Sequence, residues 1–180
     1  EEDYLHSVAV CERCKSVVEP LISEEWFLKV GEMAKEAVHV INADKQSFSA
    51  NKIEFLPSNY KKILVEWLLS IHDWCISRSL WWGHRIPVWY PSTGSGQVSE
   101  MKVSLESPGK GWVQDEQVLD TWFSSGLWPM STLGFLDQSF KLSKAFPWSF
   151  EISAPEIKYM WIARMIMLSV YFAGEVPFKT

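Results

Sequence analysis

The chain has 180 residues, a formal net charge of −5 and a sequence pI of about 5.4. Its 47% hydrophobic and 22% charged residues are close to globular averages, which excludes disordered, collagen-like and low-complexity chains. The acidic balance gives no general electrostatic reason to bind nucleic acid, so we expect any such contact to be local or to lie outside this chain. Tryptophan is unusually frequent, with 11 copies, and indicates a packed pocket or interface because each buried indole N–H needs a partner.

Two of the three cysteines, Cys11 and Cys14, form a Cys-x-x-Cys pair that can offer two thiolates to one Zn²⁺. A structural zinc site needs four ligands, and only Cys75 and His6 remain as further candidates. Two interpretations stay open. Either the pair is half of a zinc site completed elsewhere in a longer protein, or the metal has been lost and the cysteines are small buried residues. Three cysteines make no disulfide framework, which favours a reducing, cytoplasmic compartment.

In the first half of the chain, residues 1–25 are predicted to form a loop around this cysteine pair. Apolar residues spaced by three and four predict a helix over 26–42. Residues 53–56 alternate weakly and stop at a proline, so a short strand is expected there. Ser58 is a natural N-cap for a helix that runs to about residue 72.

The second half is predicted to contain, in chain order, a strand over 85–90, a loop insertion over 91–111 with a hairpin at 98–105, a strand over 148–153, a helix over 155–173 and a strand over 176–180. Pro155 fits the first position of this helix, and Gly174 fits its C-terminal end. Strand, helix and strand in this order predict a βαβ unit with parallel pairing, and hence an α/β fold. No membrane span is expected, because Arg164 interrupts the helix and its uncharged run is well short of ~20 residues.

The helix over 155–173 carries a pattern that permits two interpretations. Ile157 and Trp161 share a face, and Glu156 lies in the first turn, where a carboxylate suits the helix dipole. They are either two core residues below a dipole-compensating glutamate, which the spacing alone favours, or a small apolar pocket with a carboxylate at its rim. Such a pocket would hold a branched aliphatic group and a nearby ammonium. A lone Asp120 is interpreted as a helix cap.

Three long, Trp-rich blocks resemble the valyl-tRNA synthetase family: CISRSLWWGHRIPVWY, LDTWFSSGLWPMSTLGF and WIARMIM…GEVPFKT, in this order. The upstream block CERCKSVVEPLISEEWFLK is similar to the family at the point where its chain leaves the large editing insertion. The resemblance covers nearly the whole chain, apart from the loop at 91–111. Isoleucyl- and leucyl-tRNA synthetases share only degraded versions of these blocks.

The resemblance implies part of a class I catalytic domain, a Rossmann-like parallel sheet split by the editing insertion. Residues 1–25 would be a zinc-ribbon-like linker leaving that insertion, and residues 26–180 would be the second part of the catalytic domain. The implied reaction joins valine to ATP, giving valyl-adenylate and pyrophosphate, and then transfers valine to the 3′ end of tRNA(Val). ATP with Mg²⁺, valine and tRNA(Val) are therefore the expected partners of a cytoplasmic, monomeric parent enzyme.

The resemblance also implies that Trp122, Ile157 and Trp161 line the valine side-chain pocket. Glu156 would lie where the family usually has an Asp facing the α-amino group, so it departs from the family by one methylene. A rigid wall of Trp and Ile excludes isoleucine by steric overlap. The same wall cannot strongly reject threonine, a limit for which the valine enzyme is itself the known example.

The family's HIGH and KMSKS motifs are absent from this sequence. They bind the ATP phosphates and stabilise the transition state by positive charge. We therefore expect no catalytic residue in this chain and no adenylate formation by the chain alone. Two alternatives remain: a segment of an isoleucine-specific relative, and a non-catalytic zinc-ribbon module whose folding depends on metal at Cys11 and Cys14.

Overall fold

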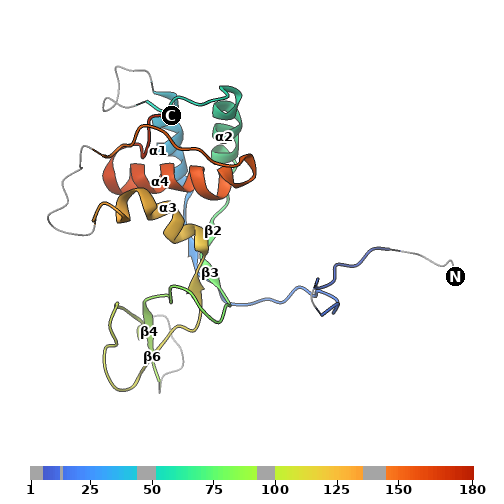
Figure 1. The fold of residues 1–180 in the computed structure, drawn as a ribbon. Helices are drawn as coiled ribbons and strands as arrows, with labels where there is room; N and C mark the ends of the chain where they lie inside the picture. Colours follow the sequence, from blue (N-terminus) through green and yellow to red (C-terminus); the bar gives the residue numbers. More distant parts are fainter. Residues whose placement is uncertain (1–5, 13, 44–51, 93–99, 136–144) are drawn as a thin grey trace.

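The body of the molecule is a set of packed helices: α1 (Gly31–Asn42), α2 (Asn59–Leu69), α3 (Thr121–Ser131) and α4 (Ala163–Ala173) (Figure 1). It is seen in a computed structural model, which describes residues 6–12, 14–43, 52–92, 100–135 and 145–180. α4 contacts both α1 and α3, and α1 also contacts α2. Because it packs on two sides, α4 is buried without interruption from Met165 to Val170.

Helix α1 follows the predicted apolar stripe. Its buried residues recur at spacings of one, three and four, as expected for a helix that packs against two others: Met33, Ala34, Ala37, Val40 and Ile41. The predicted start at Trp26 is wrong, because Phe27 and Leu28 form strand β1 (Phe27–Leu28), which pairs antiparallel with β2 (Trp74–Cys75). A distant partner strand therefore sets where the helix begins.

Helix α2 begins after Ser58 as predicted, although the Ser58 side chain makes no capping hydrogen bond. The helix ends at Leu69, short of the expected residue 72. Leu64 and Leu68 are its fully buried residues, one turn apart on the face toward α1.

The expected helix over 155–173 exists but is irregular. Pro155 opens it as a 3-10 turn, η2 (Pro155–Ile157), which is followed by a π-helix, η3 (Lys158–Ile162), and then by α4. Gly174 ends it with a φ of 66°, a left-handed conformation that glycine adopts without steric cost. A π turn within an α-helical segment frequently marks a functional site.

Two short antiparallel ribbons connect the helical body to a small sheet (Figure 1). One is β1 with β2, and the other is β3 (Ser77–Arg78) with β7 (Val118–Leu119). The small sheet has the order β5-β4-β6, formed by β4 (Val88–Pro91), β5 (Lys102–Val103) and β6 (Trp112–Gln114). The expected strand at 85–90 therefore starts three residues late. The predicted hairpin at 98–105 is wrong in its described part, because β5 pairs with β4; residues 98 and 99 lie outside the described residues.

Extended segments run side by side at the C-terminal end of the chain: 53–54, 148–151 and 176–180. Trp148 and Phe178 form a parallel bridge, and backbone hydrogen bonds join both outer segments to 176–180. The predicted parallel pairing of a βαβ unit is confirmed at this bridge. The pairing is too sparse to define the strands predicted over 53–56, 148–153 and 176–180. Together these elements give a mixed helix-and-strand architecture, in agreement with the expected class.

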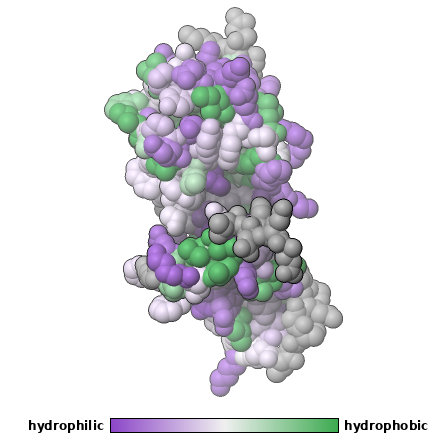
Figure 2. All heavy atoms as spheres, turned by 90° about the vertical axis from the view of Figure 1, so that its right-hand side faces the viewer, coloured by the Kyte–Doolittle hydropathy of each residue, from purple (hydrophilic) through white to green (hydrophobic). Residues whose placement is uncertain are grey.

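Figure 2 shows hydrophobic and hydrophilic side chains interspersed over one side of the molecule, with hydrophobic ones gathered beneath the helical body. Large apolar side chains that remain exposed include Leu21, Ile22, Trp81 and Trp82. The last two show that not every tryptophan of this chain is packed inside it. Within the described ranges, no helix is long and apolar enough to cross a membrane.

Helices α3 and α4 come into close contact at Gly126. A Cβ atom at this position would lie 2.7 Å from Leu168 Cδ1 and 3.3 Å from Arg164 Cβ. We expect Gly126→Ala to lower the free energy of unfolding by about 1–2 kcal/mol. Overpacking a core costs about 1–3 kcal/mol, and the better helix propensity of alanine offsets at most about 1 kcal/mol. Chemical denaturation measures the change.

The matched control is Gly31→Ala, because nothing lies within 4 Å of a Cβ at Gly31. This variant should be at least as stable as the unmodified chain, since alanine favours the helical state. Equal unfolding free energies for the two variants would contradict the close packing of α3 on α4.

Candidate functional site

The apolar residues predicted to contact valine lie on α3 and on the irregular turns before α4. Trp122 is the second residue of α3, Ile157 ends η2, and Trp161 lies in η3; all three are half-buried. The Trp161 indole N–H donates a hydrogen bond to the backbone carbonyl of Ser125 at 3.1 Å. Ser125 lies three residues after Trp122 on α3, so this bond brings Trp161 to the part of α3 that carries Trp122.

The predicted partner of the ammonium, Glu156, lies in the middle of η2 and is exposed. The neighbouring Lys158 does not neutralise it, because the Lys158 Nζ donates to the Pro155 carbonyl at 2.8 Å. The Glu156 carboxylate is therefore open to solvent beside the half-buried Ile157, as a rim position requires.

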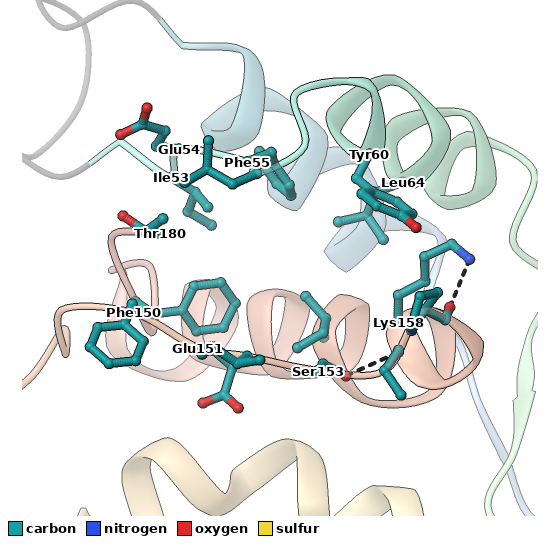
Figure 3. Close-up of a pocket in the computed structure, with 16 residues that line it drawn as sticks. Ile53, Glu54, Phe55, Tyr60, Leu64, Phe150, Glu151, Ser153, Lys158 and Thr180 are labelled. Carbon is teal, nitrogen blue, oxygen red and sulfur yellow. Dashed lines mark hydrogen bonds between the residues drawn. The ribbon is translucent and has the colours of Figure 1, made fainter.

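A cavity of about 380 Å³ is lined by sequence neighbours of Glu156, Ile157 and Trp161 but by no residue of α3. Its walls come from the extended segments, from α2 and from the start of the helical turn at Pro155, as Figure 3 shows. Pro155 and Lys158 line it, but none of the four predicted valine contacts does: Trp122, Glu156, Ile157 and Trp161. Sequence reasoning missed this cavity because its lining is drawn from segments spread between Ile53 and Thr180.

The cavity is apolar inside and charged at its edges. Its interior is formed by aromatic and aliphatic side chains, including Phe55, Leu64 and Phe150. The carboxylates of Glu54 and Glu151 point away from each other (Figure 3). Burial raises the pKa of the Glu151 carboxyl above its ordinary value.

The start of α3 holds a buried carboxylate. Asp120 is the N-cap residue of α3, but its side chain makes no capping bond. The carboxylate instead accepts the Trp74 indole N–H at 2.9 Å and pairs with the Arg78 guanidinium at 3.3 Å. It is only 6% exposed. Asp120 thus has the predicted cap position, but capping by its side chain is wrong: the partners of the side chain lie 42 and 46 positions upstream, where no short-range pattern reveals them.

The Trp74 ring extends this cluster to the C-terminal helix. The Arg164 guanidinium carbon lies 4.1 Å from the centre of the Trp74 ring, a cation–π contact. Arg164 also donates to the Tyr159 carbonyl at 3.3 Å, within η3. Burial lowers the pKa of Arg164, and the nearby Asp120 carboxylate opposes that shift. Trp74 is thus held between a carboxylate and a guanidinium.

A second polar cluster fixes the ribbons. The Glu25 carboxylate accepts hydrogen bonds from the Ser77 hydroxyl and, at 2.8 Å, from the Gln117 amide. The buried Ser77 hydroxyl accepts the Trp26 backbone N–H at 2.8 Å. The bonds from Ser77, from Ser23 and from Gln117 lower the pKa of Glu25. The cluster joins the N-terminal segment to β3 and to the residue that precedes β7.

The cysteine pair forms a turn as predicted. The Cys11 N–H donates to the Ser16 carbonyl at 2.8 Å. Lys15, which follows Cys14, adopts a left-handed φ of 62°. Hydrogen bonds to Ser16 lower the pKa of the exposed Cys14 to about 7. In the portion that the structure describes, no group of three or more His, Cys, Asp or Glu side chains could hold a metal ion.

Residues 7–180 match the family of tRNA synthetases class I (I, L, M and V). A valine–tRNA ligase of Solibacter usitatus (strain Ellin6076) is 45% identical over an alignment of 185 positions, which includes 99% of this chain and 20% of that protein. The valine–tRNA ligase of Dehalococcoides mccartyi (strain CBDB1) is 44% identical over 181 residues, with the same shares. The valine–tRNA ligase of Streptomyces coelicolor (strain ATCC BAA-471 / A3(2) / M145) is 45% identical over 179 residues, which cover 98% of this chain and 20% of that protein. The chain spans about a fifth of the length of the curated relatives it matches.

The raised pKa of Glu151 predicts a pH-dependent stability. A raised pKa means that Glu151 contributes to the free energy of unfolding while it is protonated. This contribution is fully present below the pKa of the unfolded chain, about 4.3, and is lost as the pH rises through the pKa of the folded chain. We expect Glu151→Gln to raise the Tm at pH 7 and to flatten the decline of the Tm as the pH rises from about 4 to about 7. The gain stays below about 3 °C because the carboxyl is largely solvated. Thermal melts across this pH range measure it.

The control Glu36→Gln makes the same chemical change at an exposed position of α1. It should leave the shape of the Tm profile unchanged. A Glu151→Gln profile that runs parallel to that of the unmodified chain would refute the desolvation of Glu151.

Proposed function

Because this chain belongs to the class I tRNA synthetase family, we propose that it is a segment of a valine–tRNA ligase and forms the amino-acid side of its catalytic centre. The observation that carries this proposal is identity of 41–46% to valine–tRNA ligases across nearly the whole chain. The proposed reaction of the whole protein joins the valine carboxylate to the α-phosphorus of ATP, with release of pyrophosphate. Attack by the tRNA 3′ terminal hydroxyl then releases AMP.

In this proposal the chain selects valine by shape. Trp122, Ile157 and Trp161 form the wall of the pocket, and the hydrogen bond from Trp161 to Ser125 supports this by fixing one indole against α3. Glu156 receives the α-ammonium, which its exposure permits. A rigid apolar wall discriminates one extra methylene by about 1–3 kcal/mol. We expect the ATP phosphates and their Mg²⁺ to be bound outside this chain.

We also infer that the parallel pairing belongs to a larger Rossmann-like sheet. The segment 148–151 is joined on one side to 176–180, while Phe150 and Ile152 are 63% and 81% exposed. Unpaired backbone groups at a strand edge favour pairing with a further strand, and exposed apolar side chains on a sheet face favour cover by another element. Relatives about five times as long supply the residues for one. The apolar cavity beside this edge is then a contact surface for the rest of the enzyme.

The test is a chimera. Residues 7–180 replace the matching segment of the Streptomyces coelicolor valine–tRNA ligase, and valine-dependent ATP–pyrophosphate exchange and tRNA charging are measured. We expect the chimera to be active and the isolated chain to show no exchange, since the chain lacks the phosphate-binding motifs. A folded chimera that prefers isoleucine would favour the isoleucine-specific alternative.

Pocket variants of the chimera sharpen this experiment. Ile157→Ala and Trp122→Ala should each raise kcat/KM for isoleucine relative to valine by about tenfold or more, because a wider pocket admits the extra methylene. The control Trp112→Ala changes a half-buried tryptophan of β6, in the small sheet and not in the helical body. A ratio unchanged in both pocket variants would remove these residues from the valine site.

The cysteine pair offers a test of the zinc-module alternative. Two thiols are half of a structural site, so we expect the chain alone to bind zinc weakly and its Tm to be unaffected by a chelator. Metal analysis after purification and melts with and without the chelator measure both. One tightly bound zinc per chain and a fold lost on chelation would favour the interaction module, and Cys11→Ser should then abolish binding.

A further inference from the structure

We propose that Asp120 is a positioning residue for the amino-acid pocket, and that it orients Trp122 directly and Trp161 through Trp74 and Arg164. This inference rests on the proposed function, because it concerns the pocket that those two tryptophans are proposed to form. The Asp120 carboxylate is buried outside the pocket and connects the elements that carry the pocket residues, so it determines the geometry of the pocket.

The first step is the fixation of α3. The Asp120 N–H donates to the Ile76 carbonyl at 2.7 Å, and the Asp120 carbonyl accepts the Phe123 N–H at 2.9 Å. Its carboxylate is held at the same time by Trp74 and Arg78. Both the backbone and the side chain of the residue that opens α3 are therefore fixed to β2 and β3. Since Trp122 follows two residues later, its direction is set by these bonds.

The second step reaches η3. Trp74 holds Arg164 by its ring face, and Arg164 holds the Tyr159 carbonyl, which lies two residues before Trp161. A π turn leaves backbone carbonyls less regularly bonded than an α turn does. The side chain of Arg164 therefore supports the segment from the α4 side, while the Trp161 indole bonds to Ser125 on α3.

The electrostatics make the carboxylate hard to replace. Asp120 is 6% exposed. Its carboxylate pairs with the Arg78 guanidinium, and its charge also favours the charged form of Arg164. An asparagine can still accept the Trp74 N–H but leaves both guanidiniums with less compensation. An alanine also leaves the buried indole N–H without its acceptor, so the whole cluster loosens.

The test uses the chimeric ligase with Asp120→Asn. We expect KM for valine to rise about 10- to 100-fold and the preference for valine over isoleucine to fall, because small displacements of a positioned wall cost binding and rate. KM for ATP should change less than twofold, since we expect ATP to be bound elsewhere. The control Asp73→Asn makes the same change at an exposed aspartate beside Trp74 and should leave every constant unchanged.

A second variant, Trp74→Phe, keeps an aromatic ring beneath Arg164 and removes the N–H that Asp120 accepts, together with part of the buried ring volume. It should shift KM for valine in the same direction by a smaller factor, and it decides the question where Asp120→Asn fails to fold. If Asp120 had a purely structural role, the variant would show a kcat lowered in proportion to the fraction of folded enzyme, with KM and selectivity unchanged. That result in an active chimera would overturn the role of Asp120 alone. An unmodified chimera that cannot activate valine would contradict the proposed function and this inference with it.

Discussion

The Asp120 carboxylate connects parts of the chain that are far apart in sequence. It binds Trp74 at the end of the β1–β2 ribbon and Arg78 in β3, and it opens α3. A buried charge is stable only when it is paired and hydrogen-bonded, so these partners must assemble together or not at all. The polar cluster around Asp120 therefore joins the helical body to the ribbons, while the packing around this cluster is apolar.

The local patterns of the sequence were sufficient to predict helices at α1, α2 and α4, but they predicted no helix at α3, whose interior holds Gly126 and Pro129. The apolar stripe of α1, the start of α2 after Ser58, and Pro155 and Gly174 at the ends of the C-terminal helix are all encoded within a few residues. The βαβ order also predicted the parallel pairing of Trp148 with Phe178. These features depend on spacing and on the conformations of proline and glycine, which can be read without a partner.

The rest depends on contacts across long sequence separations. Helix α1 starts at Gly31 because a strand more than 40 residues away pairs with Phe27 and Leu28. Asp120 turns from its own helix toward Trp74 for the same kind of reason. The cavity lining and the π turn at 158–162 have no short-range signal that the periodicity could reveal. The residues of the valine pocket were predicted from the family resemblance. The spacing of Ile157 and Trp161 alone favoured core residues in place of a pocket.

The π turn also constrains how the sequence can change in length. Losing one residue from 158–162 would close the wide turn to α geometry, and the segment would lose one of the side-chain positions that now place Tyr159 on Trp67 and Trp161 on Ser125. Losing one residue from 148–151 would slip that segment by one position against 176–180 and turn its side chains to the opposite face. Insertions and deletions should therefore gather in the surface connections of this family and spare the stretch from Trp148 to Ala163.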